Sequence, residues 1–167
     1  FAPGCCVLGL AVAIVAGLLA VVPLASAAEA RWWKGNLHTH SLWSDGDDFP
    51  ESIADWYKDH GYHFLALSDH NRMLEGEQWV TESQKHHFPE ALEKNRRRFG
   101  ADWLVRRDHH GTNQYRLKTL EEFRGLLEEP GRFLMIPSEE ITSGYLSFPV
   151  HSNATNLRKK ISAKGGT

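Results

Sequence analysis

The chain has 167 residues and a formal net charge of −2, from 19 lysines and arginines against 21 aspartates and glutamates. This near-neutral balance argues against a dedicated nucleic-acid-binding protein, because such proteins usually carry a strong basic excess. Both cysteines, Cys5 and Cys6, lie close to the amino terminus, so the rest of the chain can form no disulfide and offer no thiolate to a metal. Any metal would therefore be bound by histidines and carboxylates, a donor set that suits zinc, manganese or iron.

The amino-terminal segment is apolar, and its first charged residue is Glu29. It ends in the small residues Ala25-Ser26-Ala27, which are typical of a secretory cleavage site, and we expect a signal peptide over 1–27. At about 20 residues the apolar stretch could also span a bilayer as an uncleaved anchor. Either alternative predicts export to the periplasm or the extracellular space, with membrane contact only if the leader stays attached. Because the chain starts with Phe and lacks a basic n-region, we expect it to begin inside a longer gene product.

Hydrophobic periodicity and turn signals predict alternating strands and helices along the rest of the chain. In chain order we expect a strand over 34–40, a helix over 51–60, a buried strand over 63–71, a helix-rich segment over 78–99, a hairpin over 103–119 turning at 111–113, a helix over 119–128, a buried strand over 132–140 and one more strand over 148–156. This alternation indicates a parallel α/β architecture.

Polar side chains follow the predicted strands at the points where they end. His38 and His40 close the first strand, on one side of it because they are two residues apart. His70 follows the second strand, and Glu139 and Glu140 follow a later one. The carboxyl ends of parallel strands are where α/β folds build their sites. Four parallel strands cannot close a barrel, however, and the chain ends on a polar, glycine-rich segment, so we expect it to be truncated at its carboxyl end.

Five short motifs accompany these strand ends, in the order His-Thr-His-Ser (38–41), Ser-Asp-Gly (44–46), Ser-Asp-His-Asn (68–71), Pro-Ser-Glu-Glu (137–140) and Val-His (150–151). Together they resemble the PHP family, named for polymerase and histidinol phosphatase, over about 32–157. The resemblance implies a distorted (β/α)7 barrel that binds two or three divalent ions, Mn, Zn or Fe, at the carboxyl ends of its strands. Only the N-terminal part of this barrel is expected here, as a truncated domain over 32–167.

The resemblance also implies roles for single residues. The metal ligands would be His38, His40, Asp45, His70, Glu140 and His151. Asp69 would serve catalysis by orienting a histidine ring or a bound water. Arg72 is a candidate from its position, because it follows the Ser-Asp-His-Asn motif and could bind a phosphate oxygen of the substrate, although a plain surface arginine is an open alternative. Because Ser138 replaces the glycine that the family commonly has, Glu139 remains an alternative to Glu140. The family has further ligands near its end that this chain lacks.

Other candidate residues are given structural roles. Trp43, beside the Ser-Asp-Gly motif, is expected to cover the core, with stacking on a substrate ring as the alternative. Six further histidines are expected not to bind metal: His60, His63, His86, His87, His109 and His110.

The expected function is that of a metal-dependent hydrolase, a phosphoesterase that uses a metal-activated water on a small-molecule substrate. No nucleophilic side chain is needed, which agrees with the lack of cysteine and of a Gly-x-Ser-x-Gly motif after the leader. Two alternatives stay open: hydrolysis of an amide or another non-phosphate bond, and a metal-bearing binding module without turnover. The fragment alone is expected to be inactive.

Overall fold

The structure is a computed structural model that describes residues 30–82, 86–146 and 148–163. The chain divides into two compact units, Phe1–Arg31 and Trp32–Thr167, and every described helix and strand belongs to the second. The signal peptide expected over 1–27 lies outside the described residues. Among the residues that are described, no helix is both long and apolar enough to cross a membrane.

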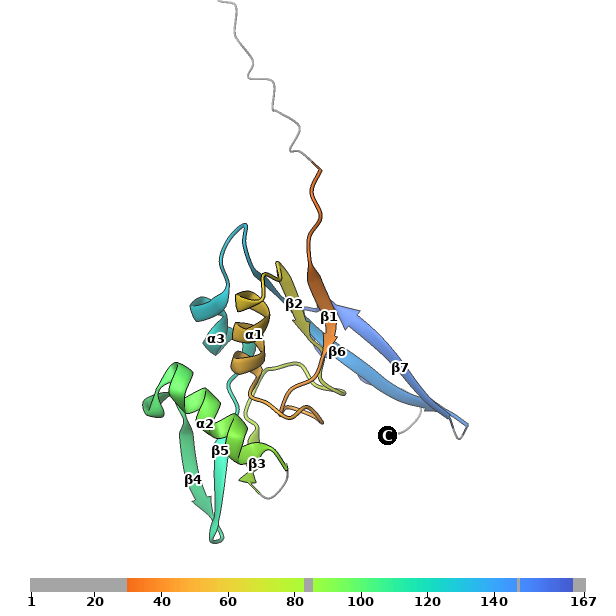
Figure 1. The fold of residues 1–167 in the computed structure, drawn as a ribbon. Coiled ribbons are helices and arrows are strands. Elements are labelled where there is room, and N and C mark those ends of the chain that lie inside the picture. Colours follow the sequence, from red (N-terminus) through yellow and green to blue (C-terminus); the bar gives the residue numbers. More distant parts are fainter. Residues whose placement is uncertain (1–29, 83–85, 147, 164–167) are drawn as a thin grey trace, which may run out of the picture. The chain divides into compact units, whose positions relative to one another are not determined.

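The central sheet has four strands in the order β1-β2-β6-β7 and curls into half of a barrel (Figure 1). Its strands are β1 (Gly35–Thr39), β2 (Phe64–Leu67), β6 (Leu134–Tyr145) and β7 (Phe148–Thr155). β2 lies parallel to both β1 and β6, as the alternating pattern predicts. The carboxyl ends of these three strands therefore meet at one edge of the sheet.

The fourth strand differs from the expectation, because β7 runs antiparallel to β6. Tyr145 pairs with Phe148, so only 146–147 separate the two strands. A parallel partner would need a crossover of about a dozen residues, and a connection this short allows only a hairpin. The prediction of four parallel strands is wrong, and His151 reaches the sheet edge from an antiparallel strand.

Three α-helices accompany the sheet among the described residues: α1 (Pro50–Asp59), α2 (Phe88–Phe99) and α3 (Leu120–Leu127). Proline stands in the first turn of α1, where its missing N–H costs nothing, and Gly61 with φ of 71° follows the helix. Thr119 caps α3 as predicted, in a capping box with Glu122. α1 packs against β2 on one face of the sheet, and α2 and α3 pack against α1 (Figure 1).

A second, smaller sheet has the order β3-β5-β4, with strands β3 (Trp79–Thr81), β5 (Thr112–Arg116) and β4 (Val105–His109). The predicted hairpin is confirmed, with its turn at 110–111, one residue before the expected position. The segment 78–99, expected to be rich in helix, begins instead with β3. Val80 is buried and pairs with Tyr115, so tertiary packing gives these residues a strand partner that local periodicity does not reveal.

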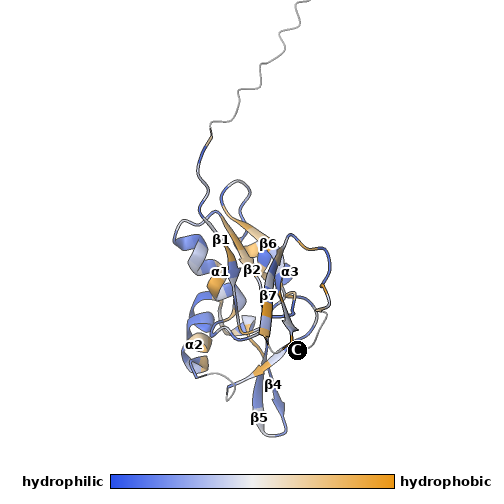
Figure 2. Cartoon of the chain, turned by 90° about the vertical axis from the view of Figure 1, so that its right-hand side faces the viewer, coloured by the Kyte–Doolittle hydropathy of each residue, from blue (hydrophilic) through white to orange (hydrophobic). Residues whose placement is uncertain are grey.

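The core lies between the central sheet and the helices. Its fully buried aromatic side chains are Phe49, Phe88, Phe123 and Phe133. Trp43 is buried as expected, and its indole N–H donates to the carbonyl of Lys118 at 3.1 Å. Figure 2 shows hydrophobic residues along the central strands and mainly hydrophilic ones on the β4–β5 hairpin. Burial of apolar area thus holds the helices to the sheet.

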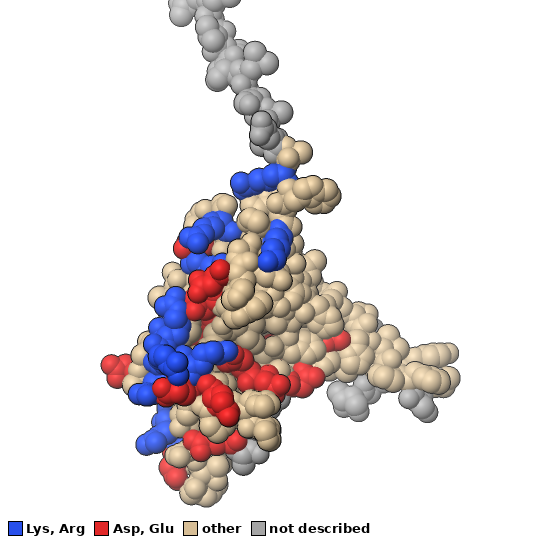
Figure 3. All heavy atoms as spheres, viewed as in Figure 1, with Lys and Arg blue, Asp and Glu red and all other residues tan. Residues whose placement is uncertain are grey.

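Charged side chains gather on the helical side of the molecule, whereas the free end of the β6–β7 hairpin carries none (Figure 3). The basic residues near α2 are mixed with acidic ones: Arg98 forms two hydrogen bonds with Asp55, and Arg96 pairs with Glu93. Mixed charges of this kind are typical of a solvated protein surface.

One buried acid stands out in this core. Glu51 on α1 is 1% exposed, and its Oε1 accepts from Asn95 Nδ2 at 2.7 Å and from Trp103 Nε1 at 2.8 Å. Its Oε2, like Asn95 Oδ1, is buried without a partner among the described residues. Burial raises the pKa of Glu51 although both hydrogen bonds lower it. The folded state therefore binds the Glu51 proton more tightly than the unfolded chain does.

Replacing Glu51 with glutamine is expected to change how stability depends on pH. At a pH below the unfolded pKa both states of the wild type are protonated and no penalty exists. As pH rises above it, ionisation favours the unfolded chain and the wild type loses free energy of unfolding. Glu51→Gln never ionises, and its amide can donate to Asn95 Oδ1. The melting temperature of Glu51→Gln, measured by circular dichroism, should therefore rise relative to that of the wild type as the pH is raised from 4 to 7. A difference between the two melting temperatures that stays constant with pH would contradict this prediction.

Candidate metal centre

Six polar side chains meet at the edge where the parallel strands end. They are the residues that the sequence motifs single out as ligands: His38 in β1, His40 just after it, Asp45 in the next loop, His70 after β2, Glu140 in β6 and His151 in β7. These positions are far apart in the sequence, and the parallel pairing of β1, β2 and β6 brings them together. The fold thus forms one cluster from elements that span more than a hundred residues.

Glu140 lies at the centre of this cluster and is 3% exposed. Its Oε2 lies 3.0 Å from His38 Nε2, 2.7 Å from His40 Nε2 and 3.3 Å from His70 Nδ1. Its Oε1 lies 2.7 Å from His151 Nδ1. The two oxygens of one buried carboxylate therefore face four imidazole rings.

Asp45 closes the solvent side of the cluster. Its Oδ1 lies 2.7 Å from His40 Nδ1, and its Oδ2 lies 3.4 Å from His70 Nε2. The Asp45 side chain is 64% exposed, whereas that of Glu140 is almost fully covered. The cluster thus has a buried floor and an open rim, so a solute can reach it from solvent.

The donor atoms form three groups that could each hold a metal ion: His38, His40 and Glu140; His40, Asp45 and His70; and His70, Glu140 and His151. Within each group the donor atoms lie within 4.8 Å of one another. Nε2 of His38 and Nε2 of His40 are 3.0 Å apart and approach the same carboxylate oxygen. Lone pairs that converge in this way repel each other unless a proton or a cation lies between them. A metal ion would remove this repulsion, and a set of imidazole and carboxylate donors suits Zn, Mn or Fe.

The charges in the cluster favour ionised carboxylates. Burial raises the pKa of Glu140, but hydrogen bonds with His38 and His151 more than offset it, and the pKa lies below its usual value. Burial also raises the pKa of Asp45, but the hydrogen bond with His40 and the charge of His40 lower it, and the pKa of Asp45 lies below its usual value. Both acids are therefore deprotonated at neutral pH, the state in which they bind metals.

Asp69 contacts the loop that carries the ligands. It is fully buried, and Oδ1 accepts from the Ser41 backbone N–H at 2.8 Å and from Ser44 Oγ at 2.6 Å. Oδ2 accepts from Ser41 Oγ at 2.8 Å. Burial raises the pKa of Asp69 against these hydrogen bonds. The carboxylate thereby ties the loop between His40 and Asp45 to the end of β2. The role predicted for Asp69, orienting a histidine ring or a bound water, stays a prediction.

Two further residues orient the cluster and were not assigned this role from the sequence. Thr142 Oγ1 lies 2.5 Å from His70 Nδ1, and Asn71 forms hydrogen bonds with the Thr142 backbone in both directions. Asn71 adopts φ of 50°, a left-handed conformation that asparagine tolerates better than most residues. Its place after His70 was visible in the sequence, but its partner on β6 was not.

The structure separates the two adjacent glutamates. Neighbouring residues of a strand face opposite sides, so Glu139 points away from the cluster. It is fully buried, and its Oε1 accepts from the Ile161 backbone N–H at 2.9 Å. Of the two alternatives, Glu140 is the one that lies among the histidines.

The remaining candidates lie outside the three groups. Arg72 is exposed, two residues after His70, and lines a pocket with Ser44 and Trp79. None of the six histidines expected not to bind metal occurs in these groups within the described part of the chain. His63, for example, accepts the Lys34 backbone N–H at 2.9 Å.

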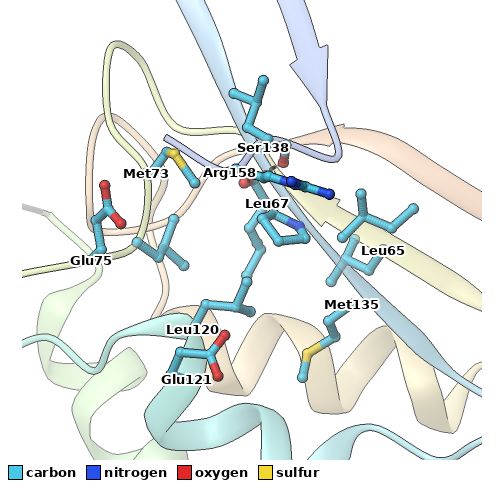
Figure 4. A pocket seen from close by; sticks show the side chains of 13 residues that line it. Leu65, Leu67, Met73, Glu75, Leu120, Glu121, Met135, Ser138 and Arg158 are labelled. Atoms are coloured by element: carbon cyan, nitrogen blue, oxygen red, sulfur yellow. Dashed lines mark hydrogen bonds between the residues drawn. The ribbon is translucent and has the colours of Figure 1, made fainter. Parts of the chain in front are cut away.

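The cavity in Figure 4 is separate from the cluster. It holds about 170 Å³ and is lined mainly by apolar side chains such as Leu65, Leu120 and Met135, with Glu75 and Glu121 nearby. None of its lining residues is one of the six clustered side chains.

Comparisons with known proteins return no match to this chain among family models, curated proteins or solved structures.

Glu140→Gln is expected to lower metal affinity at least about 100-fold, because it removes the charge that four imidazoles share. Glu139→Gln is the matched control, since an amide oxygen can still accept from Ile161. Competition with a chromophoric chelator measures both affinities for Zn and Mn. An equal loss in both variants, or a larger loss at Glu139, would show that the wrong glutamate has been placed in the cluster.

Asp69 offers a test of the loop contact. Asp69→Ala removes three acceptor interactions and should weaken metal binding about 10–100-fold by freeing the loop. Asp69→Asn keeps one oxygen for the Ser41 N–H and Ser44 Oγ, so its loss should be clearly smaller. The same chelator competition distinguishes them. If Asp69→Asn lowered metal affinity as much as Asp69→Ala, the negative charge of Asp69 and not its contact with the loop would be what supports metal binding.

Proposed function

We propose that this chain carries the metal-dependent hydrolase site of a PHP-type protein and that it cleaves phosphoesters. The observation that carries the proposal is Glu140, a buried carboxylate whose two oxygens face separate imidazoles: Oε2 faces His38 and His40, and Oε1 faces His151. A carboxylate in this position can bridge two ions. Structural ion pairs rarely need four histidines around one acid.

The three groups of donors favour a particular pair of ions. The first group, with His38 and His40, and the third, with His70 and His151, share only Glu140. Because a carboxylate has two oxygens, both groups can be filled at once. The group around Asp45 shares His40 with the first group and His70 with the third. It would therefore either complete the coordination of an ion bound in one of those groups or form a third site that competes with them.

When bound, such ions lower the pKa of a coordinated water and stabilise the charge that develops on a phosphoryl group. The residues of the chain supply the rest. Glu140 and the histidines would hold the ions, Asp69 ties down the loop that carries Asp45, and the open rim would admit the ester. Arg72 lies beside this rim, where a guanidinium could bind a phosphate oxygen.

The proposal includes the fold and the location. Parallel strands β1, β2 and β6, helices on one face and a cluster at the carboxyl ends are what a distorted (β/α)7 barrel would have in this region. The leader expected over 1–27 makes export to the periplasm or the extracellular space, followed by cleavage or anchoring, part of the same proposal.

The test is hydrolysis by the protein in its full natural length, after it has been stripped of metal and then reloaded. We expect the apoprotein to be inactive and Mn or Zn to restore turnover of 4-nitrophenyl phosphate, with one or two ions per chain by elemental analysis. The double change His38→Ala and His40→Ala should abolish both metal uptake and turnover. His110→Ala, which alters an exposed histidine of the β4–β5 turn, is the control.

Two outcomes would redirect the proposal. Turnover of amides without turnover of phosphoesters would indicate carbonyl chemistry at the same ions. Stoichiometric metal without turnover of either class would indicate a binding module. No metal uptake after reconstitution would reject the metal centre altogether.

A further inference from the structure

We propose that a pocket beside the metal cluster binds a flat aromatic group of the substrate, so that aryl phosphoesters are preferred over alkyl ones. This inference rests on the proposed hydrolase function. The pocket holds about 350 Å³, within the usual size of small-molecule sites. Its lining combines two indoles, two aliphatic side chains, a guanidinium, an amide and a hydroxyl: Trp43, Trp79, Leu42, Val80, Arg72, Gln78 and Ser44.

The pocket and the metal cluster share a wall. Ser44 lines the pocket, and its Oγ lies 2.6 Å from Asp69 Oδ1 and 3.2 Å from Asp45 Oδ1. On the other side, Arg72 lines the pocket two residues after His70. A substrate whose phosphoryl group lies at the cluster can therefore place the adjoining group in this pocket.

The walls are already formed by the fold. Leu42, Trp43 and Val80 line the pocket and are each less than 5% exposed, because they belong to the core. Trp79 is held from two directions: the Arg107 guanidinium lies 3.8 Å from the centre of its ring, and its indole N–H donates to Glu77. Aromatic and aliphatic walls that need no rearrangement bind a flat apolar group at low entropic cost.

Arg72 adds the polar part of the recognition. Its side chain is exposed, and none of the residues described around it forms a hydrogen bond or ion pair with its guanidinium. Guanidinium groups bind phosphate oxygens through paired hydrogen bonds. One cation beside apolar walls, next to the metal cluster, matches an ester that has an anionic head and an aromatic tail.

The test uses two ligands that cannot be hydrolysed, phenylphosphonate and methylphosphonate, titrated calorimetrically into the metal-loaded protein. Wild type should bind phenylphosphonate about tenfold more tightly, the range expected for stacking on one indole. Trp79→Ala should remove most of this preference and Trp79→Phe should restore much of it. Arg72→Gln should weaken both ligands by a similar factor. Trp32→Ala, which removes a tryptophan that is 98% exposed, is the control.

The outcomes separate this inference from the proposed function. Metal-dependent turnover with equal affinity for the two phosphonates would overturn the aromatic pocket and leave the hydrolase. A Trp79-dependent preference for phenylphosphonate without turnover of any ester would support the pocket and count against the hydrolase. Loss of both ligands in Trp79→Ala and Trp79→Phe, with unchanged melting, would show that Trp79 supports the cluster and not an aromatic group.

Discussion

The buried carboxylate of Glu140 is the constraint on which the site depends. An ionised acid out of contact with water is costly unless it is paired, and four imidazoles surround this one. The same contacts hold its pKa low, so the charge persists at neutral pH. The four histidines therefore have to reach Glu140 from three strands, His38 and His40 from the end of β1, His70 from the end of β2 and His151 from β7, and the pairing of the strands places each ring about 3 Å from the carboxylate.

Two sets of hydrogen bonds hold the segments that carry these side chains in place. Asp69 binds the Ser41 and Ser44 side of the loop after β1, which fixes the approach of His40 and Asp45. Asn71 binds β6 through Thr142, which fixes the approach of His70. Both anchoring residues follow β2, the middle of the three parallel strands. The Ser-Asp-His-Asn motif therefore carries one predicted ligand, His70, between Asp69, which positions the loop of His40 and Asp45, and Asn71, which positions His70 itself.

The local pattern of the chain predicted several elements correctly. The capping residue Thr119, the turn near Gly111 and the buried run in β2 are signalled by nearest neighbours, and these elements occur close to where they were expected. The direction of β7 and the strand at Trp79–Thr81 depend on partners distant in sequence. β7 follows β6 through too short a connection to be parallel, and Val80 is a strand residue because Tyr115 lies opposite it.

The sequence by itself determined which side chains are available: no thiolates after Cys6, and histidines and acids placed at the ends of apolar runs. It favoured Glu140 as the ligand but left Glu139 open as an alternative, since the two are neighbours in the same strand. The alternation of side chains along β6 settled their placement, because it turns one toward the histidines and the other toward Ile161. The role of Asp69 likewise depended on the tertiary structure, because its partners Ser41 and Ser44 reach it only when β1 and β2 pair.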